Sequence, residues 1–184
     1  VAMMPGEQGA EPWPPGAASL TALGEEARLP FIDAVFDRVL LVHALEEADA
    51  AHAMLREIWR VMAPEGRLVA IAANRWSLWA QSDISPFGHG RPYSKSQLSG
   101  LLSDALFEPV AFSRALYAPP SAWPPFVRAA DAFERIGEQV WPDHGGLLLM
   151  EAVKRLYATT ARSARRVLLA KAPIRSQEGG AGER

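Results

Sequence analysis

The clearest pattern in the sequence is a pair of short, continuous apolar runs separated by a segment with helical periodicity. Residues 36–43 (FDRVLLVH) and residues 67–73 (RLVAIAA) are the two runs. A run of this kind is typical of a parallel strand that is buried on both faces. Between them, residues 50–62 repeat apolar side chains every three to four positions, which predicts an amphipathic helix. We expect Asp49 as its N-cap and an end at Pro64.

The order of these elements predicts the fold class. A strand, a helix and a second strand joined by short connections form a βαβ unit, which is nearly always right-handed with parallel strands. Upstream, the apolar residues 1–4 are typical of the end of a strand, and residues 19–23 fit another short strand. The segment 5–18 between them is rich in Pro and Gly and is typical of a loop. The sequence therefore predicts an α/β protein.

Helices and strands continue to alternate in the downstream half. Ser94 precedes a helical apolar period, which predicts a capped helix that runs to about Ala105. The other expected elements are a short helix over 75–81, a loop over 85–93, a strand over 107–117, a helix over 126–140 and a last strand over 147–153. We expect one domain over residues 1–157 and a basic, flexible tail over residues 158–184.

Composition and charge exclude several classes of function. The chain carries a net charge of −2, with nine carboxylates in residues 1–53 and eight basic groups in residues 154–184. This balance predicts no nucleic-acid partner. No apolar run approaches the ~18 residues of a membrane span. Without cysteine the chain has no disulfide, thiolate metal site or cysteine nucleophile, which fits a cytoplasmic protein. The four histidines are too far apart for a metal motif.

Two segments resemble a known family. They are LPFIDAVFDRVLLVHALEE (Leu29–Glu47) and LREIWRVMAPEGRLVAIAANR (Leu55–Arg75). In this order and spacing they resemble the second half of the class I S-adenosylmethionine-dependent methyltransferases, although Pro64-Glu65-Gly66 replaces that family's usual Pro-Gly-Gly. Further stretches are similar to a bacterial, methyltransferase type 11-like subgroup of unassigned substrate, namely Pro5–Pro14, Pro86–Ser94 and Leu147–Lys154.

The resemblance implies a Rossmann-like sheet of seven strands, mostly parallel, with an antiparallel hairpin at its C-terminal end. It also implies an S-adenosylmethionine cofactor at the carboxyl ends of the parallel strands, where ligands of open α/β sheets bind. An acidic residue after the family's third strand binds the adenine, which points to Glu25, with Glu26 beside it. The residues after the fourth strand, His43 and Ala44, would border the methionyl part and the methyl acceptor. The alternative for these residues is structural: solvated carboxylates and a hydrogen-bonded histidine at the sheet edge.

The part of the family's site that approaches the cofactor most closely is absent from the sequence. No G-x-G-x-G turn occurs where the backbone would approach the cofactor, since Gly88-His89-Gly90 lies far downstream. Met4 stands where the family has a ribose-binding acid, and Glu7 is a candidate replacement. We therefore expect that the first strand and helix are missing. The 184 residues alone are expected to bind the cofactor weakly or not at all.

The acceptor side of the site is predicted in the segments that follow the second apolar run. In the resembling family these segments face the methyl acceptor, and here they carry Asn74, Arg75, His89, Arg91 and Tyr93. His89 is the candidate general base, because a histidine titrates near neutral pH. Arg91 could pair with a carboxylate or phosphate of the acceptor. The alternatives are an exposed histidine and an arginine that only fixes its loop.

The sequence supports two functions of different classes. The first is methyl transfer from S-adenosylmethionine to an acceptor that the sequence does not specify, a small molecule or another group. The second is a non-catalytic, methyltransferase-like chain that binds a partner or serves as a scaffold. An upstream coding sequence with a strand and a G-x-G-x-G turn would favour the first. Nothing in the sequence indicates an oligomeric state.

Overall fold

The computed structural model describes residues 1–5, 9, 11–82, 87, 90–121 and 124–156. The strands of this part form two separate sheets, one of two strands and one of four. The strands are β1 (Ala2–Pro5), β2 (Thr21–Gly24), β3 (Phe36–Val42), β4 (Met62–Ala73), β5 (Phe107–Ala115) and β6 (Leu147–Lys154). The helices are α1 (Ala44–Glu47), α2 (Ala51–Val61), α3 (Lys95–Asp104), α4 (Pro124–Arg128), α5 (Ala130–Val140) and the 3-10 helix η2 (Pro142–His144).

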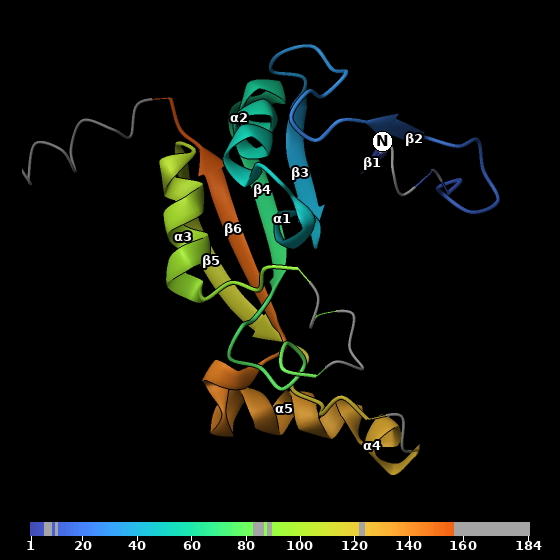
Figure 1. Ribbon diagram of the computed structural model, residues 1–184, viewed down its shortest axis with the longest axis vertical. Helices are drawn as coiled ribbons and strands as arrows, with labels where there is room; N and C mark the ends of the chain where they lie inside the picture. Colours follow the sequence, from blue (N-terminus) through green and yellow to red (C-terminus); the bar gives the residue numbers. More distant parts are fainter. Residues whose placement is uncertain (6–8, 10, 83–86, 88–89, 122–123, 157–184) are drawn as a thin grey trace, which may run out of the picture.

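The larger sheet has the strand order β3-β4-β6-β5 (Figure 1). β3 and β4 are parallel and are linked by α1 and α2, so the predicted βαβ unit is confirmed. β6 lies between β4 and β5 and is antiparallel to both. The molecule is therefore an α/β protein with an antiparallel hairpin at its C-terminal end, as the resemblance implied.

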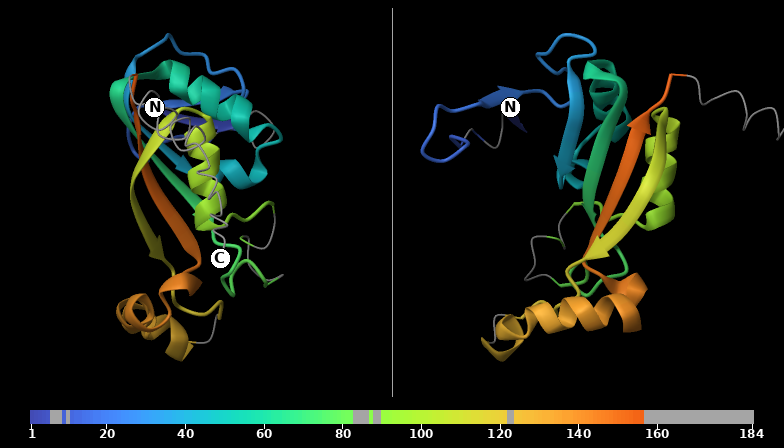
Figure 2. Two further views of the ribbon diagram at one scale, coloured as in Figure 1. Left: turned by 90° about the vertical axis from the view of Figure 1, so that its left-hand side faces the viewer. Right: turned by 180° about the vertical axis from the view of Figure 1, so that it is seen from behind.

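One face of the four-stranded sheet is covered by helices. α2 buries Met54, Leu55 and Ile58, because its apolar residues recur at helical spacing. α3 buries Leu98 and Leu102, and it lies on the same side of the strands as α2 (Figure 1, Figure 2). The sheet contributes the inward-facing residues Leu68, Ala70, Leu148 and Met150 to the same buried cluster.

The opposite face of the sheet has no helix over it in the described residues, as the view from behind shows (Figure 2). Successive side chains of a strand point to opposite faces. On β3, Val39 and Leu41 pack against the buried cluster, whereas Leu40 and Val42 are 61% and 52% exposed. The prediction that this strand is buried on both faces is therefore wrong. β3 also pairs only with β4 among the described strands, so its other edge carries unpaired backbone groups.

β1 and β2 form a parallel pair apart from the larger sheet. Their register runs from Ala2 opposite Thr21 to Pro5 opposite Gly24. This confirms the strands predicted over residues 1–4 and 19–23. Figure 1 shows the pair beyond the free edge of β3, and no ladder joins the pair to β3 in the described part of the chain.

Several predicted helix boundaries need correction. Residues 75–81 form turns instead of a helix, because the Ser77 hydroxyl and amide both bond the Asn74 carbonyl and close a tight turn. The single helix expected over 126–140 is divided into α4 and α5 at Ala129. α2 starts after Ala50 without a side-chain cap, so Asp49 is not its N-cap, and β4 begins directly after α2.

The cap predicted for α3 is confirmed. The Ser94 hydroxyl accepts a hydrogen bond from the Gln97 amide at 3.2 Å, and the Gln97 side chain accepts one from the Ser94 amide at 3.0 Å. This reciprocal pair is a capping box, which fixes where the helix begins. As a result, the loop before α3 enters the helix at a defined place beside the end of β4.

Candidate functional site

His43 stands at the carboxyl end of β3, where the strand gives way to α1. Its backbone amide donates to the Ile71 carbonyl at 3.0 Å and so extends the β3–β4 pairing by one bond. The residue then turns into the left-handed region, with a φ of 54°, and serves as the N-cap of α1. Ala44, predicted with it, is the first residue of α1 and packs against the buried cluster.

Glu46 is the buried carboxylate of this corner, and its side chain is only 4% exposed. Its Oε1 lies 2.8 Å from His43 Nδ1 and accepts the backbone amide of Ala73 at 2.6 Å. Its Oε2 has no hydrogen-bond partner among the described residues. Glu46 lies in the first turn of α1, where a negative charge is favourable. Its link between the ends of β3 and β4 was not foreseen, although the i,i+3 spacing from His43 is a usable signal.

The two glutamates after β2 occupy different environments. Glu25 is exposed, and its backbone forms a bridge with Arg28. Glu26 is partly buried, and burial raises the pKa of its carboxyl above the ordinary value. The nearby carboxylates of Asp49 and Glu47 raise that pKa further. The end of β2 therefore shares an acidic environment with α1, the helix that His43 caps.

The loop before α3 folds back over α1. It brings two residues that are predicted to face the methyl acceptor close to Glu46. The Arg91 amide donates to the Glu46 carbonyl at 3.1 Å. The Tyr93 hydroxyl donates to the Leu45 carbonyl at 3.1 Å, and the Tyr93 amide bonds the Ala73 carbonyl. Burial raises the pKa of Tyr93, and the Glu46 carboxylate raises it further, while Arg91 lowers it.

Asn74 and Arg75, also predicted to face the acceptor, make contacts that hold loops together. Asn74 is 1% exposed, and its side-chain amide donates to the carbonyls of Asp143 and Gly145 at 2.9 and 2.8 Å. Arg75 is exposed and donates to the Gln97 side chain at 3.0 Å. The end of β4 is thus fixed to both η2 and α3. An acceptor contact by either residue stays a prediction.

Two hollows lie around the turns that follow β4. A groove of about 930 Å³ runs between these turns, the start of α3 and η2, and the side chains of Trp76, Lys95, Arg114 and His144 help to line it. The second hollow, of about 360 Å³, is lined mainly by aromatic and aliphatic side chains, among them Trp79, Tyr117 and Trp141. Leu78 and His144 border both hollows.

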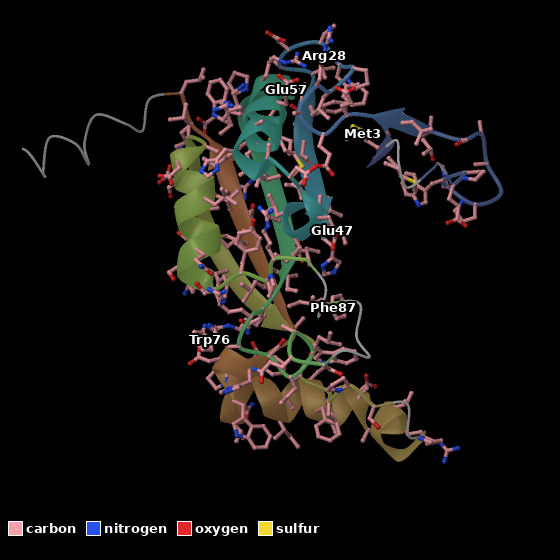
Figure 3. The ribbon with its side chains drawn as sticks, viewed as in Figure 1. Met3, Arg28, Glu47, Glu57, Trp76 and Phe87 are labelled. Atoms are coloured by element: carbon pink, nitrogen blue, oxygen red, sulfur yellow. The ribbon has the colours of Figure 1, made fainter. Side chains whose placement is uncertain are left out.

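An aromatic contact path leads from the β3 end towards these hollows. The His43 and Phe87 rings lie 4.9 Å apart, and the Phe87 and Trp79 rings 5.7 Å apart, measured between centroids. Figure 3 shows Glu47 and Phe87 one below the other on the side of the free β3 edge, with Trp76 farther along the lower end of the sheet. Of the predicted residues, His43, Ala44, Asn74, Arg75, Arg91 and Tyr93 therefore lie at one end of the sheet.

Some predicted residues fall outside the described part of the chain. They are His89, the candidate general base, Glu7, the candidate ribose ligand, and the tail over 158–184. Within the described residues, no group of three or more His, Asp or Glu side chains could hold a metal ion. No helix in the same part is long and apolar enough to cross a membrane.

Comparison with known proteins gives a match to a domain over part of the chain and a fold. Residues 11–70 match the family model described as a methyltransferase domain. No curated protein matches the chain significantly. Among solved structures, an S-adenosylmethionine-dependent methyltransferase from Thermotoga maritima is 19% identical, with a TM-score of 0.54, over 75% of this chain and 65% of its own. The methyltransferase in complex with the Trm112 activator of Haloferax volcanii is 20% identical, with a TM-score of 0.52, over 73% and 60%.

A third similar structure carries ligands. The geranyl diphosphate C-methyltransferase of Streptomyces coelicolor, in complex with Mg²⁺, geranyl diphosphate and S-adenosylhomocysteine, is 15% identical, with a TM-score of 0.51, over 73% of this chain and 52% of its own. This chain thus spans between about half and two thirds of the lengths of the three proteins. Residues 11–70 thus match a methyltransferase domain, and the chain has the fold of the class I S-adenosylmethionine-dependent methyltransferases.

Proposed function

We propose that this chain forms the part of a methyltransferase domain that binds the methionyl and adenine ends of S-adenosylmethionine and presents the methyl acceptor. The observation that carries the proposal is the corner at the end of β3. There His43, the buried Glu46 and the loop with Arg91 and Tyr93 meet beside the acidic end of β2. Ligands of open α/β sheets bind at this end of parallel strands.

The residues present fit the charge and hydrogen bonding of S-adenosylmethionine. When bound, this cofactor supplies an activated methyl group on a positively charged sulfonium. Its ammonium, adenine amino and ribose hydroxyl groups are hydrogen-bond donors, and carboxylates accept from all of them. Glu26, Glu47 and Asp49 are close enough to one another to raise the pKa of Glu26. A cation near them would relieve this repulsion. Glu25, Glu26, His43 and Ala44 are the residues that we propose to contact the cofactor.

We further propose that cofactor binding requires one more strand between β3 and the β1–β2 pair. Two observations support this. β3 has an unpaired edge in the described residues, and Leu40 and Val42 expose large apolar side chains beside it. A strand that paired there, followed by a Gly-rich turn, would complete the sheet and let the backbone approach the cofactor. A helix after that strand could cover the bare face.

On the acceptor side, we propose that the substrate approaches along the turns after β4 and the loop before α3. Arg91 and Tyr93 lie beside α1, and Trp76 is 63% exposed at the edge of the larger groove. Methyl transfer needs mainly positioning, because the donor is already activated. Loops fixed by Asn74 and by the α3 cap can provide such positioning.

The test is S-adenosylmethionine binding by calorimetry, on this chain and on a version extended upstream in frame through a G-x-G-x-G turn. We expect binding by the extended chain and at least about tenfold weaker binding by the shorter one, since the backbone contacts of the turn are lost. In the extended chain, E26Q should weaken binding, whereas E108Q on β5, far from the site, should not.

The alternative is a non-catalytic scaffold. Folded protein without binding by either chain would support it and contradict the proposal. Tight binding by the shorter chain would instead show that no further strand is needed. Neither the family match nor the structural comparisons favour the scaffold alternative.

A further inference from the structure

The contact between His43 and Glu46 fixes the protonation state of one ring nitrogen. Glu46 Oε1 already accepts the Ala73 amide at 2.6 Å, so it acts as a hydrogen-bond acceptor in this corner. The His43 Nδ1 at 2.8 Å must then carry the proton and donate it. In a neutral imidazole the other nitrogen, Nε2, is left with a free lone pair. A histidine held in this way is the arrangement that general-base catalysis uses.

The surroundings of the ring leave that lone pair open. Nδ1 is turned towards a carboxylate that is 4% exposed, and one side of the ring packs against Phe87. The His43 side chain is nevertheless 33% exposed, and no described residue bonds Nε2. Among the described residues, the ring is therefore neither fully enclosed nor hydrogen-bonded at Nε2. The ring lies at the carboxyl end of β3, where the strand gives way to α1.

The backbone conformation of His43 sets the direction of its side chain. His43 adopts a φ of 54° and a ψ of 15°, a left-handed conformation that is uncommon outside Gly but is adopted more often by Asn, Asp and His than by other residues. This conformation directs the His43 side chain towards Glu46, three residues further along the chain.

We propose that His43 is the general base of this site, oriented by Glu46, and that the methyl acceptor is a nucleophile that carries a proton. The inference rests on the proposed methyltransferase function. As the acceptor atom bonds to the methyl carbon, the carbon–sulfur bond breaks and its electron pair goes to sulfur. The proton of the acceptor atom moves to His43 Nε2, and the imidazolium that results is held by the Glu46 carboxylate until it releases the proton to water.

This assignment differs from the prediction of His89 and narrows the class of acceptor. An amine, hydroxyl or acidic carbon loses a proton on methylation and would use the base, whereas a thioether would not. The other charged groups around the corner are Glu47 on α1 and Arg91 in the loop before α3. Tyr93 from the same loop donates its hydroxyl to the Leu45 carbonyl. Glu46 is the residue that bonds the ring, so it is the positioning residue of this proposal.

The first part of the test reads the tautomer of His43 in this chain by ¹⁵N NMR of labelled histidine, with H43Q to assign the signals. We expect the Nδ1–H form to be favoured by about tenfold or more in neutral His43, because the carboxylate accepts from it. E46L should abolish this preference, because it removes the acceptor oxygen. E47L is the matched control, since it replaces an exposed carboxylate next along the same helix and should leave the tautomer unchanged. An Nε2–H form, or a preference that survives E46L, would overturn the proposal.

The second part asks whether Nε2 faces the reaction space. Diethyl pyrocarbonate acylates unprotonated imidazole nitrogens, and mass spectrometry locates the modified residue. In whichever chain binds S-adenosylmethionine by calorimetry, the cofactor should slow modification of His43 by about tenfold or more and leave the exposed His52 unaffected. Cofactor binding that leaves the modification rate of His43 unchanged would contradict the catalytic role. If neither chain binds the cofactor, the proposed function and the catalytic role both fail, while the tautomer result still decides the His43–Glu46 contact.

Discussion

The centre of the four-stranded sheet and the β1–β2 pair contain the same kind of hydrogen-bonded ladder but differ in packing. β4 and β6 pair over seven positions, and their inward side chains are buried beneath α2 and α3. β1 and β2 pair over four positions, and no described residue before Leu45 belongs to the buried hydrophobic set. Backbone hydrogen bonds contribute little net stability in water, whereas apolar burial contributes most of it. The comparison therefore separates a stable core from a region that needs further packing.

The largest expected effect contrasts the two faces of the sheet. L68A removes a side chain that is fully buried between the helices and the sheet, and it should lower the free energy of unfolding by about 2–5 kcal/mol. L40A removes the same atoms from the bare face, where Leu40 is 61% exposed. It should change the free energy of unfolding by less than about 0.5 kcal/mol. Urea denaturation followed by circular dichroism measures both. Similar losses for the two variants would mean that another element covers the bare face in solution.

The second prediction concerns the buried lysine at the end of β6. Lys154 is 4% exposed, donates to the Met62 carbonyl at 2.6 Å and lies 3.9 Å from the centre of the Trp59 ring. Burial lowers the pKa of Lys154 from its ordinary 10.5. The unfolded chain thus holds this proton more tightly, so stability should rise with pH between the lowered pKa and 10.5.

K154M should remove this rise and destabilise the protein by about 1–3 kcal/mol, because the Met62 carbonyl loses its donor. Unfolding measured from pH 7 to 10 at constant ionic strength tests it, with K95M as the control for loss of an exposed lysine. A pH slope that K154M leaves intact would assign the slope to other groups.

The smallest expected effect lies in the open region, at Glu26. Burial and the carboxylates of Asp49 and Glu47 raise the pKa of Glu26, so its charged form is unfavourable in the folded chain. E26Q should therefore stabilise the protein at pH 7, by about 0.3 kcal/mol after solvent screening. The difference should disappear as the pH falls below 4.5, where the carboxyl is protonated in both states. Thermal unfolding at pH 7 and below pH 4.5 measures the stability difference, with E108Q as the control variant. Destabilisation by E26Q at pH 7 would contradict the prediction.

The same variant connects stability with function. A residue that is unfavourable for folding but required for binding is expected at a ligand site. E26Q should therefore stabilise the chain and weaken S-adenosylmethionine binding at the same time. An exposed structural glutamate would show neither effect.

The sequence by itself determined the larger elements of this protein and their class. Apolar runs and helical periodicity located β3, β4, α2, α3 and β6, because these patterns follow directly from backbone geometry. Local hydrogen bonding was readable as well, since the α3 cap depends on Ser94 and on Gln97 three residues later. The motifs around these elements were sufficient to name the family that the sequence comparison then matched over residues 11–70.

Only the tertiary structure decided which apolar residues are covered and which polar residues meet. Leu40 and Leu41 are adjacent residues of the same type. Leu40 is exposed and Leu41 packs on the core, because helices lie on a single face of the sheet. Glu46 bonds both His43 and the amide of Ala73, 27 positions away, because parallel strands end at the same edge. Asn74 similarly meets Asp143 and Gly145 across the sheet. The contacts with Ala73, Asp143 and Gly145 depend on how distant segments pack, and no local pattern in the sequence specifies them.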